Sequence, residues 1–164
     1  MGTGLRRFFG SFPSEVRPEF VNGESSDLIR DLCDNRMVVF GAQSGNPRML
    51  EIMRGGHSVE DVRKACRVLI ERCFESVVDF IVGLPGESID EMNESAAFME
   101  ELGEMGVHLH VHTFMPLPGS PWAALAPTPI PHAVRRRMER LIAKGSLFGQ
   151  WAQQEKLVSE AYFE

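Results

Sequence analysis

The stretch VVDFIVGLPGES, residues 77–88, decides the fold class of this chain. Its first part, residues 77–84, is almost wholly apolar, as expected for a strand that is buried on both faces. The strand stops at the turn of residues 83–86, because glycine permits unusual backbone dihedrals and proline cannot continue a central strand. Ser88 begins a capping box, so a helix follows at once. A buried strand, a tight loop and a helix form the repeating unit of a parallel α/β fold.

The same alternation runs along the chain. Short runs rich in Val and Phe predict strands at residues 5–12, 37–45, 77–84 and 107–115. Helical periodicity predicts helices at residues 25–33, 46–53, 58–73 and 88–106, and one or two more from residue 132 to about 163, with a break at 144–146. Strands that alternate with helices imply βαβ units and a parallel sheet. The predicted fold is α/β, a partial TIM-type barrel of about four βα units (residues 1–126) followed by C-terminal helices (residues 127–164).

The composition argues against several classes of protein. A net charge of −6 and a pI near 5.4 do not suit a protein that holds nucleic acid mainly by neutralising phosphates. The basic helix at residues 131–144 is more typical of a solvated surface than of an RNA site. No apolar run approaches the roughly 20 residues of a membrane span. Three cysteines cannot all pair, so we expect free thiols and a soluble, cytoplasmic protein.

Each predicted strand ends in residues that suit ligand binding better than core packing. These loops are GSFPSE (10–15), GAQSGN (41–46), GLPGES (83–88) and TFMPLPGSP (113–121). Glycine allows a ligand to approach the backbone closely, and Gln, Ser and Glu supply hydrogen bonds. One such loop is ordinary turn chemistry. Four of them favour a common binding site, because the carboxyl ends of parallel strands meet at one edge of a sheet.

These loops also carry a family resemblance. The segments VFGAQSGNPRMLEIMRGGHSVEDVRKA (39–65), VDFIVGLPGESIDEMNES (78–95) and HTFMPLPGSPWAA (112–124) resemble the second half of the catalytic core of radical S-adenosylmethionine (radical SAM) enzymes. They look most similar to the group with methylthiotransferases, Elongator-type enzymes and cobalamin-binding members. The resemblance implies an iron–sulfur oxidoreductase core that holds S-adenosylmethionine (SAM) across the strand ends. There a four-iron four-sulfur cluster reduces SAM to yield a 5′-deoxyadenosyl radical.

The resemblance also implies which residues bind the cofactor. Gln43 and Ser44 would contact the ribose or the methionine part of SAM, the loop at 81–87 would lie against the adenine, and residues 114–116 would lie near its other side. The full implied set is Gln43, Ser44, Ile81, Gly83, Pro85, Gly86, Glu87, Phe114, Met115 and Pro116. Within it, Glu87 would orient its loop or cap the following helix.

Two parts of the family pattern do not occur in this sequence. They are the Cys-x3-Cys-x2-Cys loop that ligates the cluster and the glycine-rich segment of the second strand. At residues 53–57, MRGGH, Gly55 stands where the family often has arginine, unless Arg54 takes its place. We therefore expect no catalytic residues and no cluster ligands in this chain, which would be inactive alone. The expected partner is the N-terminal half of the core, from the same longer protein or another chain, or a second copy bound through an exposed sheet edge.

Two other functions stay open. HLHVH places His108, His110 and His112 on one face of a strand, a spacing that metal-dependent hydrolases with barrel folds use for zinc or iron. Asp79 and Glu15 are further ligands if the fold brings them near. The alternative to both enzymes is a non-catalytic nucleotide-binding or interaction module.

Overall fold

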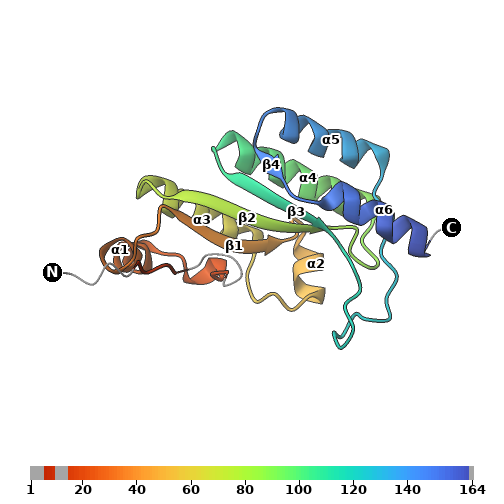
Figure 1. Cartoon of the computed structure of the whole chain (residues 1–164), viewed down its shortest axis with the longest axis horizontal. Helices are drawn as coiled ribbons and strands as arrows, with labels where there is room; N and C mark the ends of the chain where they lie inside the picture. The colour runs from red at the N-terminus through yellow and green to blue at the C-terminus, as the bar shows by residue number, and fades with distance from the viewer. Residues whose placement is uncertain (1–5, 10–14, 163–164) are drawn as a thin grey trace.

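A parallel sheet of four strands, in the order β1-β2-β3-β4, runs through the centre of the computed structural model (Figure 1). The structure describes residues 6–9 and 15–162. The strands are β1 (Met37–Gln43), β2 (Glu75–Val82), β3 (His108–Thr113) and β4 (Leu147–Phe148). The helices are the 3-10 helix η1 (Pro18–Phe20), α1 (Gly23–Leu32), α2 (Pro47–Ile52), α3 (Val59–Glu71), α4 (Ile89–Glu104), α5 (His132–Ala143) and α6 (Trp151–Tyr162). Within these described ranges, no helix has the length and hydrophobicity of a membrane span.

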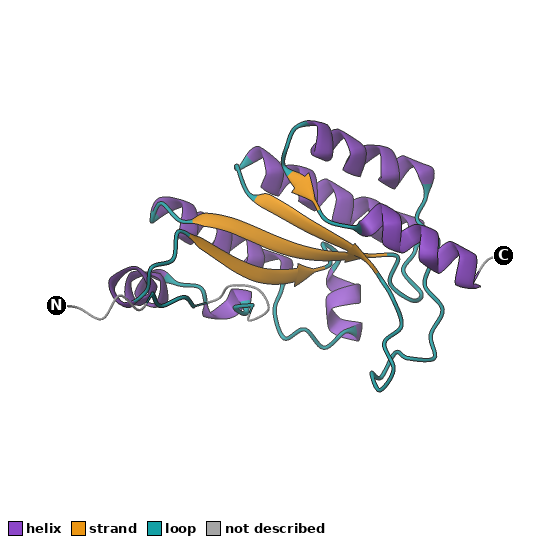
Figure 2. Cartoon of the chain, in the orientation of Figure 1, coloured by secondary structure: helices purple, strands orange, loops and turns teal. Residues whose placement is uncertain are grey.

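Helices α3 and α4 pack against the sheet, and α5 packs on α4 (Figure 2). Side chains alternate along a strand, so every second residue points into this helical layer. The core therefore takes Val78, Phe80 and Val82 from β2, and the ring of Phe80 meets that of Phe98 edge to face at 6.1 Å. The intervening strand residues, which include Asp79, face the opposite way. The sheet thus has one apolar face under helices and one face with polar side chains.

The structure confirms the predicted α/β fold and three of the four predicted strands. The predicted strand at 5–12 is wrong at residues 6–9, and its other residues lie outside the described ranges. The backbone amides of Arg7 and Phe9 bond to the side chains of Asp34 and Asn35 instead of to a strand. The residue that does reach the outer edge of β1 is Val16, through an isolated parallel bridge to Phe40.

The fourth strand lies directly after the predicted break, at residues 147–148 that were predicted as helix. Residues 144–146 do end α5, and the chain then enters β4, which pairs Leu147 with Leu109. Residues 127–164 therefore add a strand to the sheet as well as two helices. The domain boundary at residue 126 stays a prediction.

The turn after β2 is held by the proline-rich connection that returns from β3. Gly83 and Gly86 both have φ of 72°, the left-handed region that favours glycine. The Thr128 amide donates to the carbonyl oxygen of Gly83 at 3.0 Å. The Thr128 hydroxyl donates to the carbonyl oxygen of Leu84 at 2.8 Å and accepts from the amide of Gly86 at 3.1 Å. One threonine thus satisfies three backbone groups of the turn.

Alanine should destabilise the protein more at Gly83 than at Gly86. At a φ of 72°, alanine at either position costs about 1–2 kcal/mol. A Cβ on Gly83 would also lie 2.7 Å from the carbonyl oxygen of Thr128, whereas one on Gly86 meets no heavy atom within 4 Å. In urea unfolding followed by circular dichroism, we expect Gly83→Ala to lose at least about 1 kcal/mol more than Gly86→Ala. Equal losses would show that the close approach of Thr128 does not constrain the turn.

Candidate functional site

A groove of about 1070 Å³ opens at the carboxyl ends of β1, β2 and β3. This volume suits a nucleotide-sized ligand. Its apolar wall includes Leu50, Ile81, Leu84, Phe114, Met115 and Trp122. Its polar side chains include Glu15, Gln43, Arg54, Asp79, His112 and Gln154. The groove therefore combines a broad apolar surface with hydrogen-bonding groups that converge from separate elements.

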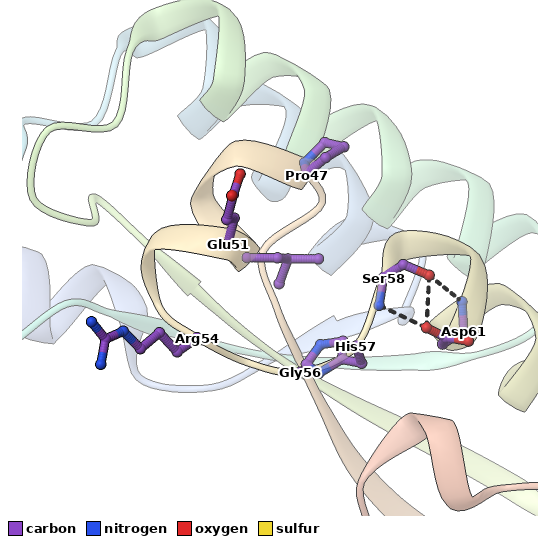
Figure 3. A pocket seen from close by; sticks show the side chains of 8 residues that line it. Pro47, Glu51, Arg54, Gly56, His57, Ser58 and Asp61 are labelled. Atoms are coloured by element: carbon purple, nitrogen blue, oxygen red, sulfur yellow. Dashed lines mark hydrogen bonds between the residues drawn. The ribbon is translucent and has the colours of Figure 1, made fainter.

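A second pocket, of about 580 Å³, lies between α2 and the start of α3 (Figure 3). Three of its polar side chains, those of His57, Ser58 and Asp61, already have partners in the fold. Ser58 and Asp61 form the capping box of α3, drawn as dashed lines, and His57 Nε2 lies 3.1 Å from the carbonyl oxygen of Ala42. The larger groove is therefore the better candidate for a ligand site.

Four of the predicted cofactor-binding residues line the large groove: Gln43, Ile81, Phe114 and Met115. Gln43 reaches it through an irregularity in β1, where the pairing register shifts between Gly41 and Gln43 and the φ of Gln43 is 62°. A Cβ on Gly41 would lie only 2.1 Å from Gln43 Nε2. The absence of a side chain at Gly41 thus leaves room for the Gln43 amide over the sheet.

The other predicted residues, Ser44, Gly83, Pro85, Gly86, Glu87 and Pro116, are not in the groove lining. Ser44 is fully buried, and its hydroxyl lies 3.2 Å from that of Ser95 on α4. A Cβ on Gly45 would lie 2.7 Å from the Cα of Ser95, so the loop after β1 packs directly on α4. In this structure Ser44 supports the loop, and its contact with a cofactor stays a prediction.

Glu87 orients the turn after β2, one of its two predicted roles. Its carboxyl group is buried and accepts a hydrogen bond from the amide of Leu84 at 3.1 Å, whereas the cap of α4 is Ser88. Burial raises the pKa of Glu87 to about 7. On the exposed side of the same turn, Arg48 of α2 donates to the carbonyl oxygen of Gly86 at 3.0 Å and pairs with Glu91.

A polar cluster lies on the open face of the sheet. It includes Asp79, which was predicted as a metal ligand only if the fold brought it near the histidines of β3. Asp79 pairs with His110 across β2 and β3, and Asp79 Oδ1 lies 2.8 Å from His110 Nδ1. The rings of His110 and His112 meet edge to face at 4.3 Å. Glu15 lies near this group, since the negative charge of Asp79 raises the pKa of Glu15. The fold thus brings together Asp79, His110 and His112, three of the five residues of the metal hypothesis, with Glu15 nearby, whereas His108 is exposed and lies outside the cluster.

Burial dominates the electrostatics of this cluster. It raises the pKa of Asp79 and, together with the neighbouring Asp79 carboxyl, raises that of Glu15 to about 7. Burial lowers the pKa of His110 and of His112, whose pKa is further lowered by its neighbour His110. Both imidazoles are therefore neutral at neutral pH, and the carboxyl pair retains a proton well above the usual range of an acid.

The basic helix α5 directs most of its charges to acidic partners. Arg137 and Arg140 pair with Glu100 of α4, and Arg135 pairs with Glu155 of α6. These ion pairs place three arginines of α5 at contacts between helices, and the absence of an RNA site on this helix stays a prediction.

Comparison with known proteins identifies the family. A family model described as the radical SAM superfamily matches residues 14–99, which are 86 of the 164 residues. The chain belongs to the radical SAM superfamily. The matched segment contains the first two strands of the sheet and both of the loops that follow them. The resemblance predicted from these loops is confirmed.

Individual relatives agree with this assignment. A tRNA-2-methylthio-N(6)-dimethylallyladenosine synthase of Pelobacter propionicus is 33% identical over 144 residues, 85% of this chain and 31% of that protein. An uncharacterised protein of Methanopyrus kandleri is 28% identical over 133 residues, 80% of this chain and 25% of that protein. This radical SAM chain therefore spans about a quarter to a third of the length of these relatives.

Solved structures share the fold. The radical SAM enzyme coproporphyrinogen III oxidase of Escherichia coli has a TM-score of 0.60 at 19% identity over 79% of this chain and 30% of that one. The archaeal Elp3 of Methanocaldococcus infernus has a TM-score of 0.56 at 19% identity over 80% of this chain and 27% of that one. The partial barrel predicted from the sequence is thus the architecture of this radical SAM chain.

The buried carboxyl of Glu87 should make stability depend on pH. A carboxyl whose pKa rises from 4.5 in the unfolded chain to about 7 in the folded one holds its proton better when folded. Its contribution to stability is therefore full below pH 4.5 and is lost as the pH rises through 7. Relative to the unsubstituted protein, Glu87→Gln should gain up to about 3 kcal/mol in free energy of unfolding between these pH values, measured by urea titrations.

Glu91 provides a control of opposite sign. Its hydrogen bond with Arg48 lowers its pKa to about 2, so its contribution is present above the unfolded pKa of 4.5 and is lost as the pH falls. Glu91→Gln should therefore lose stability relative to the unsubstituted protein as the pH rises from about 2 to about 5. Curves for Glu87→Gln that run parallel to those of the unsubstituted protein would contradict the raised pKa of Glu87.

Proposed function

We propose that this chain is the SAM-binding portion of a radical SAM iron–sulfur oxidoreductase and supplies the adenine and ribose side of the pocket. The observation that carries the proposal is the position of the groove. It lies at the carboxyl ends of β1, β2 and β3, where parallel α/β sheets bind their ligands, and the matched family segment includes the first two of these strand ends.

The groove wall suits a flat, apolar base. Ile81 is partly exposed at the end of β2. The Phe114 amide donates to the carbonyl oxygen of Val82 at 2.8 Å, and this bond holds the end of β3 beside that of β2. The Phe114 ring meets that of Trp122 edge to face at 5.8 Å. Aromatic and branched side chains at one wall supply the contact area that a purine needs.

The polar groups of the groove suit a ribose. Gln43 brings an amide with two donors and an acceptor, and Glu15 brings a carboxyl group. Arg54 also lines the groove, at a φ of 54°, and it is the arginine that we assign to the place of the family's usual one in the MRGGH segment.

The cysteines of this chain do not fit a four-iron four-sulfur cluster at the groove. Cys66 is fully buried in α3, and burial raises its pKa to about 12. Cys33 follows α1 and Cys73 follows α3, and no cysteine is in the groove lining. A cluster needs several thiolates close together. The cluster ligands of the proposed enzyme would therefore come from outside these 164 residues.

The outer edge of β1 supports a further protein segment as the partner. In the described residues, its contacts on that side include the bridge to Val16, the hydrogen bond from the Asn35 side chain to the carbonyl oxygen of Met37 at 3.0 Å, and the approach of η1. Nearby, α1 exposes Leu28 by 53% and Leu32 by 59%. An unpaired strand edge next to exposed apolar side chains is a surface on which further strands can pair. We propose that the remaining half of the core, from a longer protein or another chain, packs here, with a second copy of this chain as the alternative.

Binding of SAM should be measured first, by anaerobic calorimetric titration of the 164-residue chain. We expect saturable heat, and we expect Phe114→Ala to weaken binding about tenfold because it removes an aromatic wall of the groove. Phe20→Ala is the matched control, since Phe20 is 62% exposed and is not in the groove lining.

Three outcomes would count against the proposal. No saturable heat would contradict the idea that these residues alone form one side of the pocket. Equal weakening by Phe114→Ala and Phe20→Ala would place binding elsewhere. Equal affinity of Phe114→Ala and the unsubstituted protein, with an unchanged circular dichroism spectrum, would remove Phe114 from the site.

A further inference from the structure

We propose that Asp79, His110 and His112 form a binding site for a divalent transition metal ion of the zinc type. The site would lie on the open face of the sheet, with Asp79 and His112 in the lining of the groove, and would use no cysteine ligands. It goes beyond the SAM site proposed above, because it uses different side chains and a different class of ligand.

The parallel register places the three side chains together. Asp79 pairs directly with His110, and Ile81 pairs with His112, so one strand offers a carboxylate and its neighbour offers two imidazoles on the same face. One ligand atom from each residue lies within 4.8 Å of the others. In a tetrahedral zinc site with bonds of about 2.0–2.2 Å, ligand atoms are about 3.3–3.6 Å apart. Side-chain rotations that bring these atoms up to about 1 Å closer would therefore be needed to close the site.

The ligand set selects the class of metal. Two imidazoles and one carboxylate hold catalytic zinc and non-haem ferrous iron, whereas magnesium and calcium prefer oxygen ligands alone. The cluster also lacks competition from a cationic side chain, because within the described residues the one basic side chain in salt-bridge range of Asp79 is His110, whose imidazole is neutral at neutral pH. A cation is thus the charge that would match the Asp79 and Glu15 carboxyls.

Neighbouring side chains hold the imidazoles in place. The ring of Phe148 stacks on that of His110 at 4.8 Å. Gln154 of α6 accepts from the Thr113 amide at 2.9 Å through Oε1, and its Nε2 lies 3.3 Å from His112 Nδ1. Such outer contacts orient metal ligands in proteins. Asp79 and His112 both line the groove, so the fourth position would face it and be open to water or to a substrate atom.

The contact with Gln154 determines which ring nitrogen of neutral His112 carries the hydrogen. Since Gln154 Oε1 accepts from Thr113, Nε2 donates to His112 Nδ1, and the ring hydrogen of neutral His112 is then on its Nε2. Coordination through that Nε2 requires the hydrogen to move to Nδ1. A carboxylate at position 154 would accept from both the Thr113 amide and the Nδ1–H, so Gln154→Glu would favour the coordinating tautomer.

The test is a titration of the 164-residue chain, purified without a histidine tag, with Co²⁺ alone, followed by the visible d–d absorption of tetrahedral cobalt. We expect one Co²⁺ per chain and loss of the bands when Zn²⁺ is added. Asp79→Asn, His110→Gln and His112→Gln should each weaken Co²⁺ binding at least about tenfold, and Gln154→Glu should tighten it about tenfold.

His108→Gln is the matched control, because His108 lies on the same face of the same strand but outside the cluster. An equal loss on His108→Gln would show adventitious binding to the His-x-His strand and would overturn the site. Absence of saturable bands would overturn it as well, and unchanged affinity in Gln154→Glu would overturn coordination through His112 Nε2. Circular dichroism of each variant separates these results from unfolding. No SAM is present, so failure here is distinct from failure of the calorimetric test with Phe114→Ala.

Discussion

The turn after β2 is the constraint on which the groove depends. Its backbone groups are satisfied by three side chains: Glu87, which directly follows the turn, Thr128 in the proline-rich connection, and Arg48 on α2. Buried backbone groups that lack partners cost about 1–3 kcal/mol each, so the turn keeps its path only while these segments are docked. In return, the turn fixes where the connection after β3 and the helix after β1 lie. Both of these form walls of the groove.

The second constraint is the alternation of side chains along the strands, which decides the face of the sheet on which each residue lies. A parallel register that pairs Asp79 with His110 puts both on the open face and leaves Phe80 and Val111 in the helical layer. A slip of one residue would exchange the two faces and bury the polar set under helices. The apolar core therefore determines the register, and the register assembles the polar cluster. Packing on one face of the sheet and chemistry on the other are consequences of the same alignment.

The sequence allowed the family, the parallel α/β fold and three strands to be predicted, because these depend on local patterns. The capping boxes at Ser58 and Ser88 and the glycines of the turn are such patterns. Strand β4 was missed because two residues give no periodicity. The role of Thr128 was missed because it is a contact over more than 40 residues in a proline-rich segment that has no pattern of its own. Ser44 was assigned to a cofactor from its position at a strand end, whereas its burial against Ser95 depends on how α4 docks.

Asp79 is the residue at which local preference and the final structure disagree. It interrupts a run of buried apolar residues, and a carboxyl group there loses its hydration, as its raised pKa records. The hydrogen bond with His110 offsets part of this cost, but an apolar side chain would carry no such cost. The arginines of α5 differ, since they pair on the surface between helices and their presence needs no further explanation. Sequences depart from local consistency mainly at functional sites.

Two strand residues span about 7 Å, so the cluster around Asp79 lies about one such step below the strand ends that would meet the adenine. A ligand held at the strand ends would therefore sit beside this cluster without displacing it, and each site would be open to the other through the same groove.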